Sequence, residues 1–294
     1  MNAISEWGVH RASAVILIAL MALFLSCGDG SEPPGASEPD EPLRIISMSP
    51  NITEIIYAIG AGDLLVGVTS FCDYPPEAKE KPRVGGVIDT NYEMILSLKP
   101  DIVIDLQSQT ARIDKLEKLG LTTFIVANET IDDVLMAIDE LGDLLEKSDK
   151  ASGIKSRLIR NLGGVESKVE DLDIPTVAYV IGHSPGALQD VIVAGSDNFV
   201  NEALVLAGGS NVFAGAGTGY PYVGLEAFIK FDPDFIFDAT EKGEDVYSGI
   251  TQLKAVRDGH VFFCFDHIIQ IPGPRLHMTV EYFAKSLHPE AFEE

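Results

Sequence analysis

The stretch Arg44–Asp105, RIISMSPNITEIIYAIGAGDLLVGVTSFCDYPPEAKEKPRVGGVIDTNYEMILSLKPDIVID, decides the fold of this chain of 294 residues. Apolar runs typical of buried strands alternate in it with apolar residues at helical spacing. Asn51 and Glu54 predict a helix that Asn51 caps, and Thr90 and Glu93 predict a second capped helix further along. Because strands alternate with helices, we predict an α/β fold built on parallel sheets.

The residues on either side of this stretch divide the chain into segments. Ala14–Leu25 is an apolar run of twelve residues, which is short for a membrane span and typical of a signal peptide. Proline and acidic residues then follow, as in flexible linkers. Further on, Gly163 and Gly164 favour a bend in a charged, helix-forming segment. We therefore predict a signal peptide (1–27), a linker (28–43), an N-terminal lobe (44–146), a connecting helix (147–172) and a C-terminal lobe (173–294).

Cys27 follows the apolar run directly, with the small residue Ser26 before it. This order resembles a bacterial lipoprotein cleavage site, although Phe24 stands where leucine is usual. Cys27 is therefore predicted to carry a lipid that tethers an exported, otherwise soluble body in the periplasm or at the outer face of the cell membrane. The alternative is a plain secretory signal followed by an incidental cysteine, and both readings predict export.

The net charge of −24 argues against nucleic acid, and against an anionic membrane surface held by charge, as partners. The lipid anchor would then be the only contact with a membrane. The other two cysteines, Cys72 and Cys264, could pair in an oxidising compartment, and the sequence leaves this open. Neither has a partner at zinc-ligand spacing, so no metal site of the protein's own is predicted.

Two parts of the opening stretch recur downstream in the same order. One recurs after 133 residues and matches Glu93, Pro100, Asp101 and Asp105 with Glu226, Pro233, Asp234 and Asp238. The other recurs after 147 residues and matches the run from Asn51 to Gly62 with the run from Asn198 to Gly209. The halves are therefore predicted to be two copies of one architecture, with a cleft between them in which a ligand binds.

Short motifs run through the mature chain in one order: Ser49-Pro50-Asn51, Thr53-Glu54, Gly60–Val68, Cys72–Pro76, Gly85-Gly86, Leu98–Asp101, Leu206–Gly209, Asn211–Phe213, Tyr220-Pro221 and Pro272–Arg275. In this order they resemble the periplasmic binding proteins for cobalamin and iron chelates, which serve ABC importers. The resemblance implies two Rossmann-like lobes joined by one long helix, with limited hinge motion and no catalysis. It also implies a monomer, without a cofactor of its own, that carries a small chelate of cobalt or iron to an ABC permease.

Within this resemblance, the positions that match cobalamin-contacting residues are Phe71, Val87, Leu106, Tyr220 and Asp266. Val87 and Leu106 stand where the best-known cobalamin binder has tryptophans, and the only tryptophan, Trp7, lies in the leader. Phe71 and Tyr220 could still grip a flat, partly apolar macrocycle, so cobalamin is the leading ligand. Ferric siderophores remain an alternative, and so does haem, for which the candidate ligands are His183, His267, Tyr220 and Tyr222.

The resemblance also implies that each lobe offers a glutamate to arginine-lined pockets of the permease. The matching positions are Glu93 and Glu226, the first pair of the internal repeat. A carboxylate and an arginine can form two parallel hydrogen bonds, which suits docking in one register. For Glu93 there is a competing interpretation, because the predicted capping box would give the same side chain a local role.

The sequence also bears on two other functions, ester hydrolysis and ligand storage at the cell surface. Gly182–Gly186, GHSPG, fits the nucleophile elbow of α/β-hydrolases, with Asp266 and His267 as further members of a triad. However, Pro185 has no N–H for the oxyanion, which argues against hydrolysis. A surface protein that stores a ligand without a transporter is the remaining alternative, which the sequence separates poorly from import.

Overall fold

The computed structural model describes residues 41–240, 246–265 and 267–293. The predicted signal peptide, Cys27 and nearly all of the linker lie outside the described residues, as does Asp266. Residues from Pro42 onward form one compact unit. Across the described ranges, no helix has both the length and the apolar character that crossing a membrane requires.

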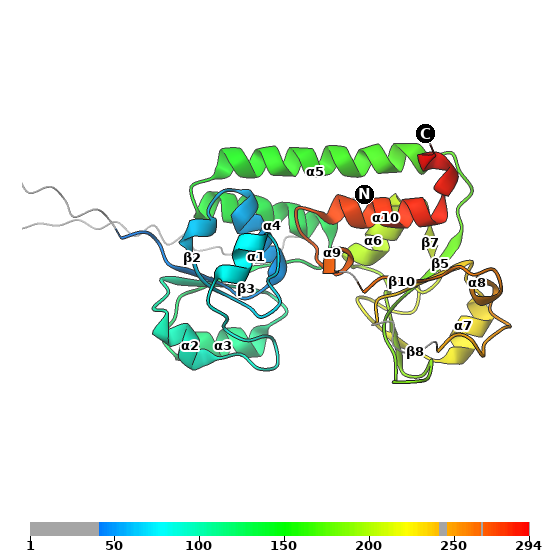
Figure 1. Ribbon diagram of the computed structural model, residues 1–294, viewed down its shortest axis with the longest axis horizontal. Coiled ribbons are helices and arrows are strands. Elements are labelled where there is room, and N and C mark those ends of the chain that lie inside the picture. The colour runs from blue at the N-terminus through cyan, green and yellow to red at the C-terminus, as the bar shows by residue number, and fades with distance from the viewer. Residues whose placement is uncertain (1–40, 241–245, 266, 294) are drawn as a thin grey trace, which may run out of the picture. The chain divides into compact units, whose positions relative to one another are not determined.

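The first half of this unit is built on a parallel sheet, as the sequence predicts. Its strands are β1 (Ile45–Ser47), β2 (Leu65–Val68), β3 (Ile102–Leu106) and β4 (Thr123–Val126), in the order β2-β1-β3-β4. The helices between and after them are α1 (Pro50–Ala58), α2 (Tyr92–Ser97), α3 (Thr110–Lys118) and α4 (Ile131–Leu144). This sheet and its helices are called the N-terminal lobe below (Figure 1).

The second half, called the C-terminal lobe, has a mixed sheet. Its strands are β5 (Thr176–Gly182), β6 (Val191–Val193), β7 (Ser210–Asn211), β8 (Tyr222–Val223), β9 (Phe235–Asp238) and β10 (Val261–Phe263). The helices are α6 (Phe199–Leu206), α7 (Leu225–Phe231), α8 (Lys254–Arg257), α9 (His267–Gln270) and α10 (Leu276–Leu287). Strand β6 pairs antiparallel with both β5 and β8, so the second sheet is mixed, while β7, β5, β9 and β10 pair in parallel as predicted.

The parallel strands of the two lobes repeat one arrangement. The order β2-β1-β3-β4 in the first sheet corresponds to β7-β5-β9-β10 in the second. The two Pro-Asp pairs also act alike, because Asp101 accepts a hydrogen bond from the N–H of Arg44 and Asp234 accepts one from the N–H of Thr176, both at 2.8 Å. Each aspartate thus holds the start of the first strand of its lobe. The repeat over 133 residues is confirmed.

Two of the predicted helix caps are wrong. Helix α1 begins after Ser49, and Asn51 lies inside its first turn, because Pro50 with its fixed φ takes the first helical position. In the repeated run, Asn198 does cap α6. Helix α2 is capped by Asn91, whose Oδ1 accepts from the N–H of Met94 at 3.0 Å, and not by Thr90.

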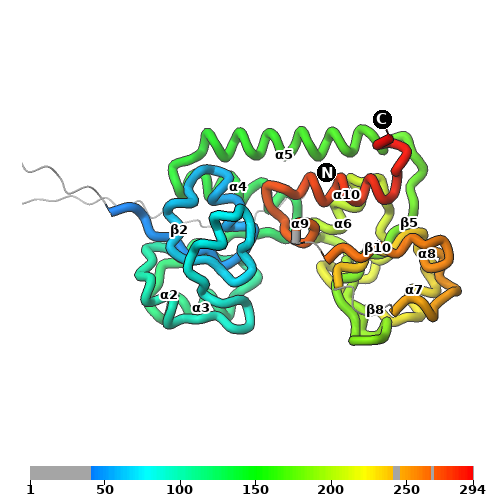
Figure 2. The backbone as a smooth tube through the Cα atoms, in the orientation of Figure 1, coloured from blue at the N-terminus to red at the C-terminus, as the bar shows by residue number. Residues whose placement is uncertain are grey.

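The long helix α5 (Ser148–Val169) joins the two lobes. It runs through Gly163 and Gly164 without a break, so the predicted bend is wrong (Figure 2). The reason is its buried face, on which Leu158, Leu162 and Val165 belong to the main core. Packing of this face against α4 and α10 outweighs the low helix propensity of two glycines.

Candidate ligand-binding site

The four parallel strands of the N-terminal lobe end at one edge, where open α/β sheets bind ligands. Phe71 and Val87 lie near each other beyond the end of β2. The ring of Phe71 covers Gly86, so closely that a Cβ at Gly86 would fall 2.7 Å from the ring. Phe71 is 53% exposed and Val87 is 60% exposed. Two of the predicted cleft residues therefore form one open apolar surface, which continues to the fully exposed Ile88.

Leu106 lies at the same edge, as the last residue of β3. It is half-buried and packs against the main core. Directly behind it, the buried carboxylate of Asp105 is held by Arg112, at 2.7 Å from Nε and 2.5 Å from Nη2. This buried ion pair fixes the end of β3, and hence the place of Leu106.

Tyr220 lies where the two lobes meet. Burial, together with the nearby carboxylate of Glu129, raises the pKa of its phenol well above the ordinary range. Glu129 follows β4 in the N-terminal lobe, and its carbonyl accepts a hydrogen bond of 2.6 Å from the N–H of Phe199, at the start of α6. Tyr220 is therefore a half-buried, neutral phenol that packs against the main core close to Glu129 of the other lobe.

His183 follows the last residue of β5, but its ring is largely enclosed. Its Nδ1 lies 2.9 Å from the carbonyl oxygen of Ser184, and its Nε2 lies 3.3 Å from Oγ1 of Thr240. Nε2 is also 3.5 Å from Oδ2 of the buried Asp238, and only 9% of the histidine side chain is exposed. Iron ligation by His183 would require one of these contacts to break.

The same segment shows why the hydrolase alternative fails on geometry. A nucleophile elbow needs a helix that begins at the serine. Here the N–H of Ser184 donates to the carbonyl of Gln189, and the chain returns as the antiparallel strand β6. The proposed triad partners cannot be placed, because Asp266 and the side chain of His267 lie outside what is described.

The glutamates predicted for docking both lie on exposed helix surfaces. Glu93 is in the first turn of α2 and Glu226 in the first turn of α7. Figure 1 shows both helices at the side of their lobe remote from α5. Within the described part of the chain, neither carboxylate has a hydrogen-bond or ion-pair partner. Since Asn91 caps α2, the competing role of Glu93 in a capping box is removed.

Sequence reasoning missed a contact that links the two halves. Arg275 binds the buried carboxylate of Glu54 through two nitrogens, at 2.8 and 2.5 Å. The same guanidinium lies 3.8 Å from the ring centre of Tyr74. Glu54 and Arg275 stand in two separate motifs of the sequence, and no spacing rule connects residues that are 221 positions apart.

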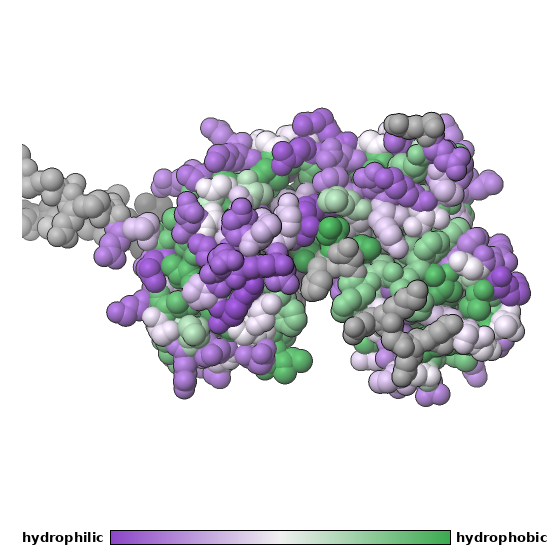
Figure 3. All heavy atoms as spheres, viewed as in Figure 1, coloured by the Kyte–Doolittle hydropathy of each residue, from purple (hydrophilic) through white to green (hydrophobic). Residues whose placement is uncertain are grey.

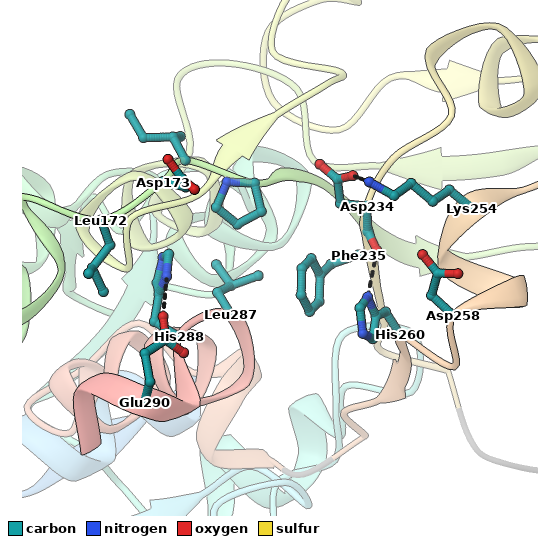
Figure 4. Close-up of a pocket in the computed structure, with 12 residues that line it drawn as sticks. Leu172, Asp173, Asp234, Phe235, Lys254, Asp258, His260, Leu287, His288 and Glu290 are labelled. Atoms are coloured by element: carbon teal, nitrogen blue, oxygen red, sulfur yellow. Dashed lines mark hydrogen bonds and ion pairs between the residues drawn. The ribbon is translucent and has the colours of Figure 1, made fainter. Parts of the chain in front are cut away.

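The surface of the protein has two separate hollows that are relevant to ligand binding. Figure 3 shows a hollow between the two lobes on the side away from α5. A second hollow of about 530 Å³ lies at the opposite, amino-terminal ends of β5, β9 and β10, where His260 stacks on Phe235 (Figure 4). Ligands of open α/β sheets bind outside the carboxyl ends of strands, so we do not assign the second hollow as the ligand-binding site. Over the described ranges, no group of three or more histidine, cysteine or acidic side chains could hold a metal ion.

Cys72 and Cys264 do not form the disulfide that the sequence left open. Both thiols are buried and free. Burial raises the pKa of Cys264 to about 12, with the carboxylate of Asp238 adding to the effect. The hydroxyl of Thr69 lies 3.0 Å from Sγ of Cys72.

Comparison with known proteins shows which proteins this chain resembles. A family model described as "Periplasmic binding protein" matches residues 45–266. An uncharacterized ABC transporter substrate-binding lipoprotein of Bacillus subtilis, YvrC, is 31% identical over 86% of this chain and 82% of its own. The vitamin B12-binding protein of Vibrio parahaemolyticus is 29% identical over 82% of this chain and 86% of its own.

Solved structures give the same picture. The vitamin B12-binding protein BtuF of Vibrio cholerae superposes with a TM-score of 0.72 at 28% identity, over 85% of this chain and 98% of that one. The haem-binding protein RhuT of Roseiflexus sp. RS-1 has a TM-score of 0.74 at 24% identity, over 85% and 100%. At that identity the second likeness shows the fold alone.

A repeated α/β architecture on one long helix, with apolar side chains at a carboxyl edge, defines a two-lobed ligand-binding protein. The chain belongs to the periplasmic binding protein family. Its role is therefore substrate binding for an ABC importer, rather than catalysis.

Proposed function

We propose that the protein captures cobalamin, or a related corrinoid, in the space between its lobes. The observation that carries this proposal is the open apolar surface of Phe71 and Val87 at the carboxyl edge of the first sheet. A flat macrocycle with an apolar edge can lie against such a surface. Leu106, Tyr220, Asp266 and His183 complete the proposed site. Several relatives that cover most of this chain are named as vitamin B12-binding proteins, which supports the choice.

A haem or ferric siderophore is the second candidate. The observation that favours it is Tyr222, whose side chain is 72% exposed, because a phenolate is a hard ligand that suits ferric iron. Among the predicted haem ligands it is more accessible than His183. Replacing Tyr222 with phenylalanine separates the two candidates, since it removes the iron ligand and leaves every residue of the proposed corrinoid site unchanged.

Capture depends most on Phe71. In Phe71→Ala, we expect the ligand to bind about 10-fold more weakly or worse, since an aromatic ring in contact with the ligand is lost. Calorimetric titration with cobalamin measures this, and Ile159→Ala on the exposed surface of α5 is the matched control. Equal affinity of Phe71→Ala and the unchanged protein would remove Phe71 from the site.

We also propose that Glu93 and Glu226 dock a monomer onto arginine-lined pockets of the permease. Their exposure and the lack of a partner within the described residues support this role. A purified permease with its ATPase subunits should be stimulated by the protein and should not respond to the Glu93→Arg, Glu226→Arg double variant. Full stimulation by that variant would place docking elsewhere.

Export and anchoring complete the proposal. Cys27 would carry the lipid, and residues 28–43 would be a flexible linker between this anchor and the lobes. The lobes would comprise residues 44–146 and 173–294, joined by the segment 147–172. The naming of a relative as a lipoprotein supports the anchor. Metabolic labelling with a fatty acid, lost in Cys27→Ala, tests it.

A further inference from the structure

Each lobe presents the same pair of side chains on one helix face. Leu96 stands three residues after Glu93 in α2, and Ile229 stands three residues after Glu226 in α7. Residues three apart are neighbours on a helix surface. The exposed fractions of the two aliphatic side chains are nearly equal, at 41% for Leu96 and 42% for Ile229.

A buried residue fixes the rotation of each helix. Ile95 in α2 and Phe228 in α7 stand at matching positions of the repeat, and both are 0% exposed. Each belongs to the hydrophobic core of its own lobe. Because these anchors cannot turn outward without opening a core, the glutamate and the aliphatic side chain are held facing outward in both lobes.

A single exposed leucine or isoleucine is ordinary on a protein surface. What requires an explanation is that the pair recurs on two helices that the fold repeats, each time beside a carboxylate without a partner among the described residues. The helices also end alike, with Lys99 at φ 47° and Asp232 at φ 43°. The two pairs are therefore presented in the same local frame.

We propose that Leu96 and Ile229 are the apolar half of the docking surface. The occupant is the ABC permease, with two equivalent sockets that each hold a guanidinium beside an apolar side chain. The inference rests on the proposed docking role of Glu93 and Glu226, and it adds the residues that keep water from the two ion pairs. An exposed ion pair contributes little by itself, whereas contacts that exclude water around it make it a stable anchor.

The first test identifies what touches these positions. A photo-crosslinking phenylalanine analogue replaces Leu96 or Ile229 in the full chain, in the cells that produce it, with Ile159 on α5 as the control position. The expected crosslink from the first two, and not from the third, is to a permease subunit identified by mass spectrometry. Crosslinks to a second copy of this chain, or none at all, would overturn the inference.

The second test measures affinity for that permease in nanodiscs. Leu96→Gln with Ile229→Gln should bind roughly 10- to 50-fold more weakly, because two partly exposed aliphatic side chains no longer become buried. The control is Ile159→Gln with Ile174→Gln, two exposed isoleucines off this face, which should bind like the unchanged protein. Normal binding by the first variant, while Glu93→Arg with Glu226→Arg abolishes binding, overturns this inference alone. Normal binding by both variants overturns the proposed docking role as well.

Discussion

The contact between Glu54 and Arg275 offers a quantitative test of how the two halves are held together. The Glu54 side chain is 3% exposed and that of Arg275 is 17% exposed. In Arg275→Met the methionine keeps part of the apolar volume, but the carboxylate loses its only described cation. Removing one partner of a buried pair costs about 3–5 kcal/mol, since an uncompensated charge remains in a poorly solvated place.

A smaller loss comes from Tyr74, over whose ring the guanidinium lies. That cation–π contact contributes about 0.5–1 kcal/mol, so the free energy of unfolding of Arg275→Met should fall by about 3.5–6 kcal/mol in all. The assay is urea unfolding followed by far-ultraviolet circular dichroism. Circular dichroism is chosen because residues 42–294 contain no tryptophan for a fluorescence signal, the only one being Trp7.

The double variant Glu54→Met, Arg275→Met separates charge from packing. Without a buried carboxylate, it should recover most of the stability that Arg275→Met loses, because a well-packed apolar pair can replace a buried ion pair. A loss below about 1 kcal/mol in Arg275→Met, or a double variant less stable than both single variants, would refute the reasoning.

Three further predictions concern stability and reactivity. Gly163→Ala with Gly164→Ala should raise the free energy of unfolding by about 1–2 kcal/mol, since α5 is helical at both positions and an added Cβ meets nothing within 4 Å; a loss of stability would show that the glycines serve a bend. Asp234→Asn should be about 1–2 kcal/mol less stable than the unchanged protein near neutral pH. Burial alone would raise the pKa of Asp234, but the Lys254 ammonium and Thr176 hold this pKa at about 2, below its ordinary 3.8. The difference in stability between Asp234→Asn and the unchanged protein should therefore disappear as pH falls from 3.8 through 2. A difference in stability that persisted below pH 2 would contradict this cause. In residues 42–294, a thiol reagent at neutral pH should label Cys72 and Cys264 only at the rate of unfolding, because burial raises both pKa values; fast labelling of folded protein would show otherwise.

Local sequence patterns predicted most of the helices and strands of the fold. Strands rich in isoleucine and valine, and the Pro-Asp pairs ahead of β3 and β9, marked the elements from sequence alone. The repeat predicts that Asp101 and Asp234 are equivalent, and both accept a hydrogen bond at the start of the first strand of their lobe. Such features depend on nearby residues and on period, which is why they can be read along a chain.

The errors arose where a neighbour or a distant partner decided the outcome. Asn51 has a side chain that can cap a helix, but Pro50 occupies the first helical position of α1, so the N-cap position falls on Ser49. Gly163 and Gly164 weaken an isolated helix, yet the buried face of α5 keeps it straight. The contact between Glu54 and Arg275, and the enclosure of His183 by Asp238 and Thr240, depend on tertiary packing that no spacing reveals.

We propose that this chain captures a chelate reversibly and does not transform it. The most direct measurement is a titration of residues 28–294 with cobalamin, haem and a ferric siderophore, by calorimetry and absorbance, with recovery of the ligand afterwards. If the proposal holds, binding of cobalamin, or of one iron chelate in its place, is saturable and one-to-one, and that ligand is recovered unchanged. Absence of binding to all three, or chemical conversion of the one that binds, would contradict it.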